Sequence, residues 1–85
     1  MKTFFVEITD TFGGEANYSW VTRHKVTAST ERGAMRRIGR DSGLSWRRVA
    51  HYGDSQRWDS ASGATCAFVE EFDPANHSRY SVNTL

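Results

Sequence analysis

The sequence predicts an α+β domain in which one helix packs on one face of an antiparallel sheet of about four strands, in the order β-β-α-β-β. Segments with alternating apolar residues flank a single segment with helical periodicity, and glycine or proline marks the joints between them. The chain has 85 residues, which is enough for one domain. We place this domain at residues 1–74 and a polar C-terminal tail at 75–85.

The first two expected strands, residues 3–11 and 18–28, pair as an antiparallel hairpin. Apolar side chains alternate along the first strand. In the second strand the alternation is imperfect, because His24 shares a face with Val26. A turn is expected between the strands, since the paired glycines at 13–14 permit a positive φ.

A single amphipathic helix is expected between an N-cap at Ser29 or Thr30 and a C′ glycine at Gly43. On a helical wheel its apolar residues gather on one side and its arginines on the other. The apolar side holds Ala34, Met35 and Ile38, and the outer side holds Arg32, Arg36, Arg37 and Arg40. The two glycines inside the helix each weaken it by about 1 kcal/mol relative to alanine, so packing must hold it.

A third strand is expected over residues 45–52, with a short continuation at 56–59, and the last strong strand covers 64–72. Asp73 and Pro74 end that strand. The tail is polar and expected to be loosely held; the alternative is that its apolar residues dock as an extended edge.

Charge is unevenly distributed along the chain, although the formal net charge is only +1. Residues 23–57 carry +6, whereas residues 1–22 carry −2 and residues 58–85 carry −3. Most of the bases are arginine, which favours multidentate contact with carboxylates, phosphates or aromatic faces. This basic middle indicates an anionic partner; the alternative is a solvated face balanced by the acidic ends.

Enzymatic chemistry is not expected. The lone Cys66 lies in an apolar strand, where a buried inert thiol is the usual outcome, and no metal-ligand spacing links the histidines to it. We therefore expect neither a catalytic residue nor a metal or other cofactor. We also expect no membrane helix, no signal peptide and a cytoplasmic location, because no apolar segment is long enough and one cysteine suits a reducing compartment.

The strongest candidate for a functional surface lies between residues 32 and 58. Arginines there alternate with aromatic residues that could stack on unpaired bases or anchor a protein interface. The alternative keeps the tryptophans in the core and the arginines solvated. The candidate partner-binding residues are Arg32, Arg36, Arg37, Arg40, Trp46, Arg47, Arg48 and Trp58.

Residues 6–21, Val-Glu-Ile-Thr-Asp-Thr-Phe-Gly-Gly-Glu-Ala-Asn-Tyr-Ser-Trp-Val, resemble the start of a group of small proteins from phages and other mobile elements. The resemblance covers about the first half of the chain, and no catalytic residue comes with it. It implies a stoichiometric protein that blocks a host protein or nucleoprotein, as anti-CRISPR and other counter-defence inhibitors do. The expected function is thus inhibition by steric occlusion; a DNA- or RNA-binding module is the alternative, and homodimerisation is open.

Overall fold

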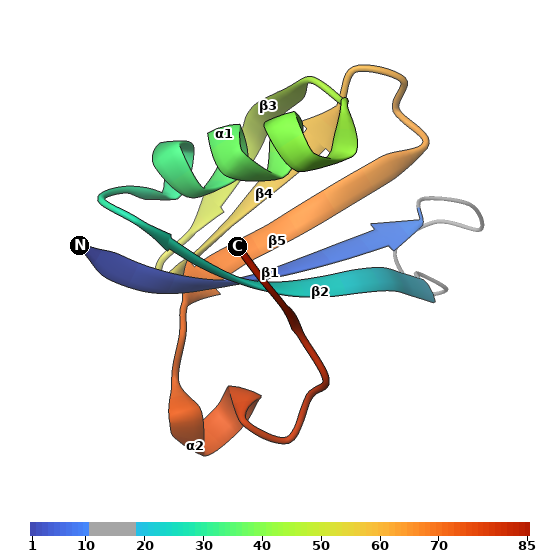
Figure 1. Cartoon of the computed structure of the whole chain (residues 1–85). Helices are drawn as coiled ribbons and strands as arrows, with labels where there is room; N and C mark the ends of the chain where they lie inside the picture. Colours follow the sequence, from blue (N-terminus) through green and yellow to red (C-terminus); the bar gives the residue numbers. More distant parts are fainter. Residues whose placement is uncertain (11–18) are drawn as a thin grey trace.

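The computed structural model describes residues 1–10 and 19–85 of the chain (Figure 1). The strands are β1 (Lys2–Asp10), β2 (Ser19–Ala28), β3 (Trp46–Tyr52), β4 (Ser55–Ser60), β5 (Thr65–Glu71) and β6 (Asn83–Thr84). The helices are α1 (Glu31–Ser42) and α2 (Pro74–His77). The turn expected around the glycines at 13–14 lies outside the described residues. Within the described ranges, no helix is both long and apolar enough to cross a membrane.

The strands form one mixed sheet of six strands in the order β3-β4-β5-β1-β2-β6. The α+β class is confirmed, but the prediction of about four antiparallel strands is wrong in two details. β4 is a full strand between β3 and β5, and β6 pairs with β2 in parallel. β6 corresponds to the alternative that the tail docks as an extended edge, and it was not counted as a strand because its two residues lie in a polar segment too short for any alternation to be read.

α1 crosses one face of the sheet and encloses the core (Figure 1). Every second residue of β1 points to this face, so Phe4, Val6 and Ile8 meet the helix residues Met35 and Ile38. Val26, Trp58, Ala67 and Val69 complete the cluster from the neighbouring strands. The predicted apolar side of the helix is therefore the buried side.

The ends of α1 are fixed by two local hydrogen bonds. Thr30 is the N-cap, and its side-chain oxygen accepts a hydrogen bond from the Gly33 amide at 3.0 Å. Gly43 ends the helix with φ of 73°, a left-handed conformation that favours glycine, and its amide donates to the Gly39 carbonyl at 2.9 Å. These caps set the length of the helix and thus the positions of its arginines.

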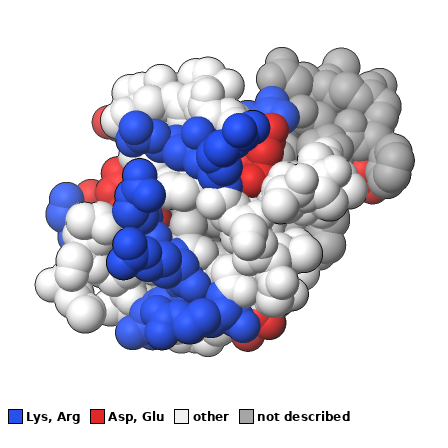
Figure 2. Space-filling view, turned by 90° about the horizontal axis from the view of Figure 1, so that it is seen from above, with Lys and Arg blue, Asp and Glu red and all other residues white. Residues whose placement is uncertain are grey.

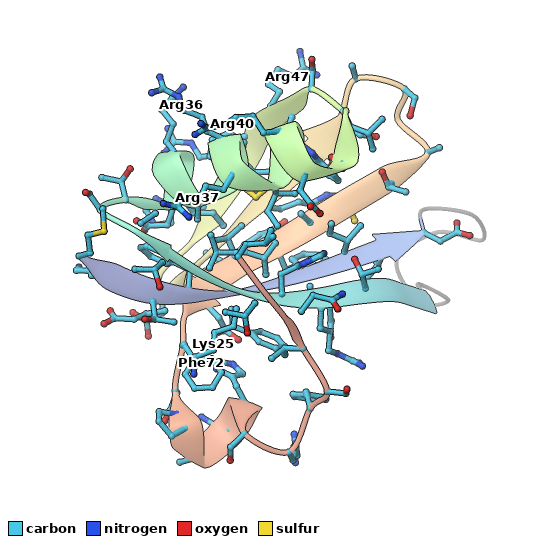
Figure 3. All side chains as sticks on the ribbon, in the orientation of Figure 1. Lys25, Arg36, Arg37, Arg40, Arg47 and Phe72 are labelled. Carbon is cyan, nitrogen blue, oxygen red and sulfur yellow. The ribbon has the colours of Figure 1, made fainter. Side chains whose placement is uncertain are left out.

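The segment after β5 passes below the sheet and then returns along the outer edge of β2 (Figure 1). Residues 75–85, which the sequence assigns to a polar tail, contribute most of α2 and the whole of β6. The Leu85 amide donates to the Lys25 carbonyl at 2.8 Å, and the Leu85 side chain packs against the core. Beneath β2, Lys25 Nζ lies 4.5 Å from the ring centroid of Phe72 (Figure 3).

Candidate partner-binding surface

The outer side of α1 carries four exposed arginines, as the helical wheel predicts. Arg36 projects away from the sheet at the top of the molecule in Figure 3. Arg37 and Arg40 line a shallow hollow together with Asp41 and Leu85, which places them on the β2 flank of the helix. Arg32 lies on the other flank, with its guanidinium carbon 5.8 Å from the ring centroid of Trp58.

The remaining two predicted arginines lie on β3, the strand at one edge of the sheet. Arg48 is opposite Trp58 in the register with β4, which puts it on the same face of the sheet as α1. Arg47 is opposite Asp59 and belongs to the other face. Both side chains are exposed, so this edge strand presents a guanidinium group on each of its faces.

Two adjoining hollows connect the helix to this strand. One, of about 290 Å³, is lined by Arg32, Arg36, Trp46 and Trp58 among others. The next, of about 270 Å³, is lined by Arg32, Arg48, Gln56 and Trp58 with their neighbours. Arg32 and Trp58 border both hollows, so five of the predicted residues lie close together here. Three of the predicted residues lie elsewhere: Arg37 and Arg40 are on the β2 side of α1, and Arg47 is on the opposite face of β3.

The tryptophans of the predicted set are largely enclosed. Trp58 is only 4% exposed and donates its indole N–H to Gln56 Oε1 at 3.0 Å. Trp46 is half-buried against the core, and its indole nitrogen has no hydrogen-bond partner among the described residues. Trp58 thus supports Arg32 from below and does not offer a free face to a partner.

Arginines of this chain fall into two groups that differ in their partners. On the face opposite α1, Arg23 Nε lies 2.7 Å from Glu7 Oε2, and Arg57 Nε lies 3.0 Å from Asp59 Oδ1. In contrast, six other arginines make no ion pair with any residue in 1–10 or 19–85, and we call this group the arginine surface. It consists of Arg32, Arg36, Arg37, Arg40, Arg47 and Arg48.

Seen from above, lysine and arginine side chains form two bands on the face that carries α1, with acidic groups beside and between them (Figure 2). Acidic side chains gather elsewhere, around a hollow of about 670 Å³ that is lined by Glu7, Glu31, Asp54, Glu70, Glu71 and Asp73. Lys2 and Arg79 line the same hollow. The separation of charge in space is partial, because Glu31 also lines the hollow beside Arg32 and Arg48, and Asp41 lines the hollow beside Arg37 and Arg40.

His24 lies beneath α1 on the β2 side and is buried. Its Nε2 lies 2.9 Å from Thr22 Oγ1, and its Nδ1 has no partner within the described part of the chain. Burial lowers the pKa of the imidazole below its ordinary value of 6.5, and the nearby Asp41 carboxylate raises it in partial compensation. The His24 ring is thus held neutral under the basic surface.

The structure adds exposed apolar residues that the sequence analysis did not select. Leu44 and Val49 are each 43% exposed, and Tyr52 is 54% exposed. All three lie on β3 or just before it. No pattern in the sequence marks these side chains as exposed, because their exposure follows from the position of β3 at the edge of the sheet.

The chain was compared with protein-family models, with curated proteins and with solved structures, and none of the three comparisons found a match. In residues 1–10 and 19–85, no three of the His, Cys, Asp and Glu side chains gather closely enough to hold a metal ion. The arginine surface is accordingly interpreted from its own geometry.

Proposed function

We propose that this chain is a non-enzymatic binding domain of phage or mobile-element type that inhibits a host protein or nucleoprotein by steric occlusion. The arginine surface would contact an acidic area of the target in the host cytoplasm and deny the target its nucleic acid or partner subunit. A CRISPR or other defence complex is the class of target that this proposal favours. The resemblance of residues 6–21 motivates the class of target, and the surface motivates the mode of binding.

The observation that carries the proposal is that the arginine surface makes no ion pair with any residue in 1–10 or 19–85. Six guanidinium groups are exposed without an ion pair to any described residue, while Arg23 and Arg57 on the opposite face are paired with carboxylates. A group of like charges repels itself and costs stability unless a partner neutralises it. An anionic partner supplies that neutralisation.

A protein target fits this surface better than a single-stranded nucleic acid does. Binding to unpaired bases relies on several exposed aromatic faces, whereas Trp58 is enclosed in the core and Tyr52 alone offers an exposed ring beside these arginines. The exposed Leu44, Val49 and Tyr52 lie beside the arginines and give the mixed arginine and apolar composition that is typical of protein interfaces.

The size of the domain suits occlusion. A standard protein interface buries about 800 Å² on each partner. That is about one-seventh of the 5264 Å² accessible surface of this chain, so an interface of standard size would occupy a minor part of its surface. With a longest extent of 32 Å, the bound domain would cover a site wide enough for a nucleic-acid duplex.

The decisive experiment is capture of partners from nuclease-treated bacterial lysate, followed by titration of the purified partner. The test variant combines Arg36→Ala with Arg40→Ala, and the matched control combines Lys2→Ala with Arg79→Ala, which removes the same charge elsewhere. We expect the test variant to lose at least tenfold in affinity and the control to bind like the unmodified chain. Equal binding by both variants would remove the basis of the proposal.

A nucleic-acid module is the second candidate, because Arg32 and Arg48 border the same hollow and could clamp a phosphate. It predicts that affinity for labelled DNA or RNA falls steeply with salt, with a logarithmic slope of about −0.9 for each phosphate neutralised on duplex DNA. Fluorescence anisotropy at low and physiological salt tests this directly. Tight binding that is lost in an Arg32→Ala, Arg48→Ala variant would rank this function first.

A further inference from the structure

β3 is an unpaired edge of the sheet. One of its sides pairs with β4, and the sheet order places no described strand on its other side. The outward backbone amides and carbonyls of an edge strand can pair with a strand from another chain. Many proteins cover such an edge or shorten it, so a seven-residue strand left open is a candidate docking site.

The exposed apolar side chains of the molecule also gather at this edge. Among residues 1–10 and 22–85, whose burial the structure describes, four large hydrophobic residues are exposed, and only Met1 lies elsewhere. Leu44, Val49 and Tyr52 lie on β3 or two residues before it. An added strand would remove this apolar surface from water as it forms its hydrogen bonds.

Arg47 and Arg48 define the charge that the added strand must carry. They are consecutive, so their side chains lie on opposite faces of the sheet, and residues directly opposite each other on neighbouring strands share a face. A strand paired with β3 therefore neutralises both arginines with two consecutive acidic residues. Beyond them it would meet Val49 and Tyr52 with apolar residues.

We propose that β3 accepts, as an added strand, a short extended segment of a protein partner that contains two consecutive Asp or Glu residues next to apolar residues. This inference rests on the proposed function and names the part of the target that is bound. The register of β3 against β4 shifts between Arg48 and Ala50, and this bulge limits regular pairing to a short stretch. Arg32 and Arg36 on α1 flank the same edge and add to its attraction for acidic residues.

Charge argues against a second copy of the chain as the occupant. Pairing two β3 strands would bring Arg47 and Arg48 of both copies to one seam, where like charges are destabilising. Arginine on an edge strand is a common means of preventing such self-pairing. With an acidic segment the repulsion becomes an attraction, and the same two arginines then favour pairing.

A selection from a displayed library of random 12-residue peptides on the immobilised full chain tests the proposal. We expect enrichment of adjacent acidic pairs followed by β-branched or aromatic residues, without proline. The best peptide is then synthesised, and its affinity is measured by fluorescence anisotropy. Changing Arg47→Glu and Arg48→Glu together should weaken binding at least tenfold, whereas Lys2→Glu with Arg79→Glu should change it less than twofold.

Backbone pairing is tested by N-methylation of the peptide. In an edge-paired strand, alternate amides point to β3, so methylating one alternate set should abolish binding and methylating the other should be tolerated. Three results would overturn the inference: no enriched acidic pair, equal tolerance of both methylated sets, or amide shift changes confined to α1 in NMR spectra. Circular dichroism verifies that each variant is folded.

The outcomes also separate this inference from the proposed function. If partner capture depends on Arg36 and Arg40 but is insensitive to the Arg47 and Arg48 reversal, the function stands and the edge-strand mode is wrong. If neither pair matters to capture, both are wrong. A concentration-dependent dimer that the β3 reversal abolishes would identify a second copy as the occupant and would likewise overturn the inference.

Discussion

Phe5 and His77 stack face to face, with ring centroids 4.2 Å apart and planes inclined by only 6°. Phe5 belongs to β1 and points away from α1, and His77 ends α2. His77 Nδ1 accepts a hydrogen bond from the Asp73 amide at 2.8 Å, and its Nε2 lies 2.7 Å from Glu70 Oε1. Because Nδ1 accepts a hydrogen bond, the neutral ring carries its proton on Nε2, and this N–H donates a hydrogen bond to Glu70 Oε1. The ring thus joins the C-terminal segment to β1 and β5.

Replacing His77 by alanine should destabilise the fold. The His77→Ala change removes a buried aromatic ring and both of its hydrogen bonds, which together cost about 2 to 4 kcal/mol in the free energy of unfolding. Urea unfolding followed by circular dichroism measures this loss. Asn76→Ala, in the same short helix, serves as the control; it removes only the exposed hydrogen bond from Asn76 Nδ2 to Asp73 Oδ2 and should cost at most about 1 kcal/mol. Equal stability of the two variants would show that α2 is not held by this stack.

His24 makes the stability of the domain depend on pH. Burial lowers the pKa of its imidazole in the folded state, so the unfolded state takes up a proton first as the pH falls. The contribution of His24 to the free energy of unfolding is therefore fully present above its ordinary pKa of 6.5 and is lost progressively below it. Asp41 raises the folded pKa in part and limits the size of the loss.

The measurement compares the unmodified chain with the His24→Gln variant by urea unfolding at several pH values between 5 and 8. The difference in unfolding free energy between the two chains should be constant above pH 6.5 and should shift in favour of the variant below it. Subtracting the unfolding free energy of one chain from that of the other removes the contributions of the other histidines and the carboxylates. A difference that stays constant across the whole range would show that His24 is not buried neutral.

Local patterns in the sequence were enough to predict α1 and β1. Ala34, Met35 and Ile38 recur at helical spacing and are buried, and a cap residue stands before them. Such signals depend on neighbouring residues alone. The outer arginines of α1 follow from the same wheel, so four members of the arginine surface could be placed without a structure.

The length of β4 was underestimated from the sequence because the core-facing side of this strand carries polar residues. Gln56, Trp58 and Ser60 alternate and are all buried, but only Trp58 reads as apolar in the sequence. Gln56 is tolerated in the core because its Oε1 accepts the indole N–H of Trp58. The partner of a buried polar group is a property of the folded chain, and no sequence pattern reveals it.

The exposure of β3 could not be read from the sequence either. Which strand lies at an edge depends on the crossover from β2 through α1 to the far side of the sheet. The sequence brings Arg47 and Arg48 close to the helix arginines in number, but it does not say that they occupy both faces of an open edge. Trp46 and Trp58 are ambiguous for the same reason, since long-range packing decides which rings are enclosed.

The two glycines within α1 should respond to alanine in opposite ways. A methyl group at Gly33 would lie 3.4 Å from Ala28 Cβ and Thr30 Oγ1, which is an ordinary contact, whereas at Gly39 it would lie 3.0 Å from the Leu44 carbonyl oxygen. Gly33→Ala should therefore stabilise the helix by about 0.5 to 1 kcal/mol. Gly39→Ala should destabilise the domain, because the carbonyl belongs to the backbone that connects α1 to β3. Thermal unfolding of both variants gives the sign of each change in stability. If Gly39→Ala stabilises the domain, the backbone that connects α1 to β3 shifts easily.

Arg47 and Arg48 should keep separate copies of the chain apart. The open edge of β3 combines unpaired backbone groups with the exposed side chains of Val49 and Tyr52, a combination that favours strand pairing between copies. Changing Arg47→Thr and Arg48→Thr together removes the repulsion and raises the β propensity of the edge. We therefore expect this variant to self-associate at concentrations at which the unmodified chain does not.

Sedimentation velocity over a range of protein concentrations measures this change. The control variant combines Arg36→Thr with Arg40→Thr, which removes the same charge from α1 and leaves β3 unaltered. It should sediment like the unmodified chain, because lost net charge alone does not create a strand edge. If both variants associate to the same extent, the general loss of positive charge is the cause, and β3 is protected by its bulge rather than by its arginines.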